Sequence, residues 1–157
     1  VLLVPALLSV PMRTLLDFSQ GVGPVLLKSS TLLIALVLYV LLHEWVHGVC
    51  MKHFSGVKAR FGFTGLYAYA GSDAYFNRRS YLIIALAPVA VWGVVLLVIN
   101  CLVDASWFWV VYFLQVMNLS GAAGDLYVTY QFSRMPPEIL VQDSGVAMTV
   151  YAPREQD

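Results

Sequence analysis

The sequence predicts an all-α membrane bundle of three to four transmembrane helices with a small cytoplasmic β element. Hydrophobic residues make up 60% of the 157 residues and charged residues only 11%, whereas a soluble domain carries about 25% charged residues. Three stretches are as apolar and as long as the roughly 20 residues that cross a bilayer: residues 29–52, 81–103 and 105–131. The formal net charge is zero, so charge gives no support for a nucleic-acid partner.

The first of these stretches ends in an H-E-x-x-H motif, His43-Glu44-Trp45-Val46-His47. On a helix, histidines four residues apart project from one face and can share a metal ion. Glu44 lies one residue further round, where its carboxylate can reach a metal-bound water without ligating the metal. Polar residues at membrane depth are costly and usually functional, which favours a metal site over two merely structural histidines.

A catalytic zinc takes three protein ligands and leaves its fourth position to water, whose pKa it lowers to about 7. We expect His43 and His47 to supply two ligands and Glu44 to be the general base that takes the proton from this water. Asp125 is the predicted third ligand. It directly follows a run of small residues in an apolar stretch, and small residues allow helices to approach closely. His53 and Asp73 are the alternatives. His53 has the metzincin spacing, but Cys50 replaces the glycine of that pattern.

The second and third apolar stretches set the predicted topology. Basic residues gather between the first and second spans, whereas the turn between the second and third carries only Asp104. The positive-inside rule therefore puts residues 52–80 and the C-terminus in the cytoplasm, with Asp104 outside. His43 and Asp125 then lie at similar depth. The basic residues are Lys52, Lys58, Arg60, Arg78 and Arg79.

Asn118 precedes Asp125 by seven residues, which is two turns of a continuous helix. On that spacing it is a candidate to bind substrate backbone beside the metal, and an interhelical hydrogen bond is an equally good interpretation.

Two β segments are predicted on the cytoplasmic side. Residues 57–76 are rich in aromatic and β-branched residues and contain three glycines, which is typical of short strands. Residues 139–151 contain a hairpin signature at Asp143-Ser144-Gly145, after Pro136-Pro137, which excludes a helix. The two segments lie on the same side of the membrane and are candidates to pair. The sequence shows no repeats or linkers, so residues 1–157 are expected to form one domain.

With these features the chain resembles the site-2 protease class of intramembrane zinc metallopeptidases. It resembles more closely a family of small membrane proteins described as "putative zincin peptidases". The resemblance covers about residues 29–151 and implies Zn²⁺ held by His43, His47 and Asp125, with Glu44 as base. Site-2 proteases carry Asn-x-x-Pro and Leu-Asp-Gly motifs, whereas here no proline follows Asn118 and the order around the aspartate is Gly-Asp-Leu.

The predicted function is a zinc-dependent, membrane-embedded endopeptidase that hydrolyses membrane-associated proteins or peptides, with the lipid bilayer as its surroundings. The strands of residues 57–76 are expected to hold the substrate extended by edge pairing. The alternative is a non-catalytic zinc-binding membrane scaffold or sensor, in which the carboxylate of Glu44 has no chemical role.

Overall fold

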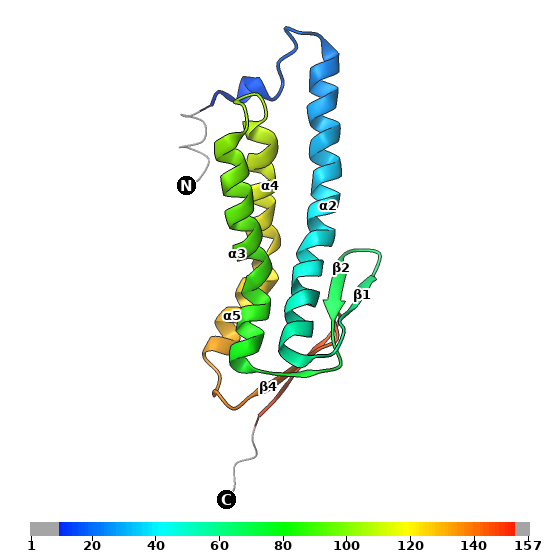
Figure 1. The fold of residues 1–157 in the computed structure, drawn as a ribbon, viewed down its shortest axis with the longest axis vertical. Coiled ribbons are helices and arrows are strands. Elements are labelled where there is room, and N and C mark those ends of the chain that lie inside the picture. Colours follow the sequence, from blue (N-terminus) through cyan, green and yellow to red (C-terminus); the bar gives the residue numbers. More distant parts are fainter. Residues whose placement is uncertain (1–9, 153–157) are drawn as a thin grey trace, which may run out of the picture. The chain divides into compact units, whose positions relative to one another are not determined.

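The computed structural model describes residues 10–152 and is mostly helical, with two small β-sheets (Figure 1). It confirms the predicted combination of helices with a small β element. Residues 1–9 and 153–157 lie outside the described residues. In chain order the elements are η1 (Met12–Thr14), α2 (Val22–Ser55), β1 (Arg60–Phe63), β2 (Ala68–Gly71), β3 (Tyr75–Asn77), α3 (Arg78–Leu102), α4 (Phe108–Gly121), α5 (Ala123–Ser133), β4 (Leu140–Asp143) and β5 (Met148–Tyr151).

Two helices are long and apolar enough to cross a membrane. They are α2, with 34 residues and a mean hydropathy of 2.3 in its most apolar window, and α3, with 25 residues and a corresponding value of 2.9. A spanning helix needs roughly 20 residues. Because α2 rises about 1.5 Å per residue, it is longer than the hydrocarbon core is thick.

The third predicted span, residues 105–131, is not one continuous helix. The structure divides it into α4, with 14 residues, and α5, with 11 residues, and places Ala122 between them. The break falls in a run of small residues, 120–124, which contains two glycines, and glycine weakens a helix interior. Neither helix alone reaches the length of a span, so a third and a fourth transmembrane helix stay predictions.

The described chain divides into two compact units. One contains residues 10–39 and 92–120, and the other contains residues 40–91 and 121–152. In the first unit Trp109 is fully buried and its indole N–H donates to the Pro11 carbonyl. The second unit contains the H-E-x-x-H motif, Asp125 and all five strands.

Two antiparallel sheets belong to this second unit. Strands β1 and β2 form a hairpin, and β4 lies between β3 and β5 in a three-stranded sheet. The pairing of β3 with β4 joins the two β segments, with Phe76 opposite Val141. The two sheets are linked where the Ser72 N–H donates to the Asp143 carbonyl at 2.7 Å.

A hydrophobic core holds the helices of this unit to the three-stranded sheet. The Tyr81 hydroxyl adds a polar link, because it donates to the Asp143 carboxylate at the end of β4. Burying large apolar side chains stabilises such a core by about 1.5–3 kcal/mol each. The core residues are Met51, Phe76, Tyr81, Ile84, Ala85, Phe132, Ile139 and Val141.

Two glycines allow the β1–β2 hairpin to pack closely on its neighbours. A Cβ atom at Gly48, directly after the second motif histidine, would lie 2.3 Å from the Phe61 ring of β1. A Cβ atom at Gly71 would lie 2.2 Å from the backbone of Ser144, in the turn between β4 and β5. Because both positions lack a side chain, the hairpin lies against the motif helix and the β4–β5 turn.

Candidate metal centre

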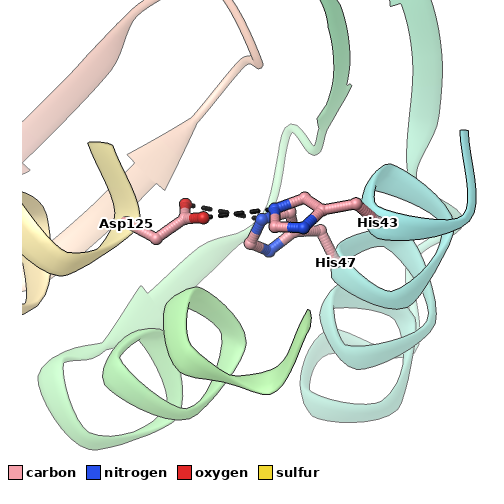
Figure 2. Close-up of side chains that lie close together, drawn as sticks. All are labelled: His43, His47 and Asp125. Atoms are coloured by element: carbon pink, nitrogen blue, oxygen red, sulfur yellow. Dashed lines mark hydrogen bonds and ion pairs between the residues drawn. The ribbon is translucent and has the colours of Figure 1, made fainter. Parts of the chain in front are cut away.

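The two motif histidines project from α2 toward Asp125, which lies in the first turn of α5 (Figure 2). The ring centroids of His43 and His47 are 5.0 Å apart. Both histidines are buried, with 8% and 9% of their surface exposed, and the Asp125 side chain is 25% exposed. The spacing of four residues predicted that the histidines share a face, and α5 brings the carboxylate to that face.

The donor atoms of these three residues lie close enough together to bind one metal ion. His43 Nε2 lies 3.2 Å from Asp125 Oδ2, and His47 Nε2 lies 3.4 Å from Asp125 Oδ1. All three donor atoms lie within 4.8 Å of one another. With zinc–donor bonds of about 2.0–2.2 Å, two donors of a tetrahedral site are about 3.3–3.6 Å apart. The donors, two imidazoles and a carboxylate, are of the kind that catalytic zinc sites use, so the cluster can hold a metal ion.

The second ring nitrogen of His47 is held by the main chain. His47 Nδ1 lies 3.0 Å from the Ile84 carbonyl oxygen of α3. A carbonyl only accepts, so this contact requires the proton to be on Nδ1. The Nε2 lone pair therefore remains available to a metal, and the ring is fixed in orientation.

Glu44, beside the cluster, is held by a main-chain hydrogen bond from a strand. Its Oε2 accepts the Ala70 N–H of β2 at 2.8 Å. In an antiparallel pair the N–H groups of alternate residues point away from the partner strand. Since the Ala70 N–H donates to Glu44, the main-chain N–H groups of β2 that point away from β1 are those of Ala70 and Ala68. The general base predicted from the sequence is thus hydrogen-bonded to the outer edge of β2.

The alternative ligands lie outside the cluster. Among the described residues, His43, His47 and Asp125 are the group with metal-binding geometry. His53 packs edge-on against the Phe54 ring. Asp73 forms an exposed ion pair with Arg60. The geometry therefore favours Asp125 over both.

The spacing argument for Asn118 assumed one continuous helix through Asp125, and the structure divides that stretch. Helix α4 ends at Gly121 and α5 begins at Ala123. Asn118 is fully buried, and its Oδ1 accepts the Tyr39 hydroxyl at 2.9 Å. This is the helix-to-helix hydrogen bond that was the alternative interpretation, and substrate binding by Asn118 stays a prediction.

Sequence reasoning missed two main-chain groups, the Ala70 N–H and the Ile84 carbonyl. Backbone groups leave no mark in a pattern of side chains. Pro88 is the one signal for Ile84, because a proline inside a helix leaves the carbonyl four residues before it without its usual donor. Ala70 has no such signal.

The site belongs to the zincin class, which is defined by two histidines and a glutamate on an H-E-x-x-H helix. Here α5 adds the carboxylate of Asp125 to this helix. A profile of the family described as "Putative zincin peptidase" matches residues 36–140. The chain belongs to this family. Zinc, the predicted cofactor, is the metal that this membership implies, and the cluster on α2 and α5 can hold it.

The chain is also similar to a curated relative whose name states no function. The chain is 31% identical over 122 residues to a protein of Pyrococcus woesei named "Uncharacterized 24.7 kDa protein in gap 5'region". The alignment covers 74% of this chain and 53% of the relative, so the chain spans about half the length of that protein. No solved structure matches the chain.

Proposed function

We propose that the protein is a zinc-dependent, membrane-embedded endopeptidase that hydrolyses peptide bonds of membrane-associated proteins. The observation that carries this proposal is the clustering of His43, His47 and Asp125, whose donor atoms all lie within 4.8 Å of one another and can share one metal ion. A structural zinc site is closed by four protein ligands, so the three donors found among residues 10–152 favour catalysis.

The chemistry divides between the metal and Glu44. Zinc, when bound, supplies a Lewis acid that makes water a nucleophile at neutral pH. The Glu44 carboxylate takes a proton from the attacking water and passes it to the leaving amine nitrogen. Because the Ala70 N–H occupies Oε2, Oε1 is the oxygen that we assign to this proton transfer. His43, His47 and Asp125 hold the reaction centre beside it.

The outer edge of β2 is the proposed docking site for the substrate backbone. Ala68 and Ala70 present main-chain groups at this edge, and Ala70 is hydrogen-bonded to Glu44. A peptide that adds to the edge as a strand is extended and lies beside the general base. Extension is required, because the carbonyl groups of a helical substrate are hydrogen-bonded within the helix.

The membrane location rests on α2 and α3. Large apolar side chains on α2 are exposed over much of its length, for example Leu33 at 65% and Val37 at 59%. Exposed side chains of this size on a 34-residue helix are compatible with lipid contact, whereas in water they would favour association. We infer a multi-pass protein with residues 52–80 and the C-terminus in the cytoplasm.

Glu44→Gln is the direct test of the proposed function. In detergent-purified protein, we expect one zinc per chain in both the wild type and the variant. We expect turnover of fluorescein-labelled casein, an unfolded substrate, to fall by about 10²–10⁴-fold in the variant, which is the usual contribution of a general base. Glu138→Gln is the matched control, because Glu138 is exposed outside the cluster and should keep full turnover.

Each other outcome has a distinct meaning. Turnover that survives Glu44→Gln would contradict the assigned base. Zinc binding without cleavage of casein or of membrane proteins would favour the non-catalytic scaffold or sensor. Absence of zinc from well-folded wild-type protein would overturn the peptidase proposal.

A further inference from the structure

Helix α3, whose Ile84 carbonyl contacts the motif histidine His47, contains a proline in its interior. Pro88 lies inside the helix and is fully buried. In an α-helix each N–H donates to the carbonyl four residues earlier, so residue 88 would normally serve the carbonyl of Ile84. Proline has no N–H, and its ring presses against that same carbonyl. The Ile84 carbonyl therefore lacks its ordinary helix donor.

The Ile84 carbonyl is also the group that accepts from His47. The distance between His47 Nδ1 and the Ile84 oxygen is 3.0 Å, and the contact is buried. A buried carbonyl without a donor is unfavourable, and His47 supplies the donor that Pro88 withholds. His47 of α2 thus donates to the Ile84 carbonyl of α3, which Pro88 leaves without a donor from its own helix.

We propose that Pro88 is a positioning residue for the metal centre: by withholding its N–H, it reserves the Ile84 carbonyl for His47 and so fixes which ring nitrogen of His47 faces the metal. The inference rests on the proposed zinc site. Outer-shell partners of ligating histidines are ordinarily carboxylates, carbonyls or water, and here the carbonyl is made available by a gap in a helix.

An N–H at position 88 would compete with His47 for the carbonyl. A carbonyl oxygen has two lone pairs, but a helix bond draws the oxygen back into line with the helix axis, away from a neighbouring helix. The ring of His47 would then lose its fixed tautomer and orientation. Loss of an outer-shell partner typically lowers metal affinity by about 10–100-fold.

The test compares two replacements of Pro88 that differ in a single N–H. Pro88→Ala introduces the donor. The α-hydroxy analogue of alanine, incorporated at the same position, forms an ester that has the same methyl group and no N–H. Zinc affinity is measured in the purified full chain by competition with a chromophoric chelator. We expect about 10–100-fold weaker zinc binding in Pro88→Ala and wild-type affinity in the ester variant. Pro136→Ala, outside the cluster, is the control for a general effect of removing proline.

Equal zinc affinity in Pro88→Ala and the wild type would overturn the inference. An equal loss of affinity in the alanine and ester variants would also overturn it, because the effect would then come from the loss of the proline ring. Absence of zinc from the wild type would overturn it as well. The readout is independent of peptidase activity. Weaker zinc binding in Pro88→Ala alone, in a protein that cleaves no peptide, would support this inference and contradict the proposed function.

Discussion

Asp125 contacts the two motif histidines and lies at the N-terminus of a helix. It lies in the first turn of α5, where free backbone N–H groups favour a negative charge. The charged carboxylate is the form that ligates zinc, and a lone carboxylate among apolar helices would be costly. The position of Asp125 thus supports its role as a ligand in two ways, through the helix dipole and through the histidines that face it.

Removing this carboxylate should weaken zinc binding. We expect Asp125→Ala to lower zinc affinity by more than the roughly 10–100-fold that loss of an outer-shell partner costs, because a ligand itself is lost. Chelator competition on purified protein measures the change. His53→Ala should bind zinc like the wild type, since His53 lies outside the cluster. The reverse pattern, loss in His53→Ala and retention in Asp125→Ala, would make His53 the third ligand.

At the scale of elements, the β1–β2 hairpin connects the proposed general base to the proposed substrate edge. Glu44 and Ala70 are 26 residues apart and share one hydrogen bond. Ala68 faces the same edge two residues earlier, and among the described residues no side chain accepts its N–H. The strand therefore donates one N–H to Glu44, and in the proposed docking mode the second N–H would bind an added peptide.

Proline at these two positions should separate catalysis from binding. Proline is tolerated where an edge N–H points away from the ladder. We expect Ala70→Pro to lower kcat, because Glu44 loses the donor that holds it. We expect Ala68→Pro mainly to raise KM, because an added strand loses a donor. Steady-state kinetics on labelled casein measure both, with zinc content as the control for folding. A fall in kcat alone in both variants would argue against docking at this edge.

For the whole molecule, the charge pattern gives a topology that can be tested. Two candidate spans, α2 and α3, would put the segment between them and Asp104 on opposite sides of the membrane. After Cys50 and Cys101 are replaced by alanine, we expect a membrane-impermeant thiol reagent to label Asp104→Cys in intact cells. Lys58→Cys should be labelled only after the cells are opened. Labelling of both in intact cells would contradict the two-span arrangement.

The residues that local periodicity governs could be predicted from the sequence. The helical spacing of the motif gave the shared face of His43 and His47, and alternation with turn residues gave the small β element. The division of residues 105–131 at Ala122 was not predicted, because alanine favours helix and the adjacent glycines only weaken it. The Glu44–Ala70 hydrogen bond was not predicted either, since it depends on the packing of a strand edge against a helix rather than on any periodic pattern.

The order of the elements along the chain sets when the unit that contains the candidate site can be completed during synthesis. The two strands are separated in the chain by α3, α4 and α5, and β5 completes the sheet only at Tyr151. A nascent chain that has just released α2 from the ribosome carries the H-E-x-x-H motif without Asp125 and without the central strand of the sheet. The unit that contains the site is therefore completed last, after both candidate spans have been made. A half-made chain carries two of the three residues of the candidate metal centre.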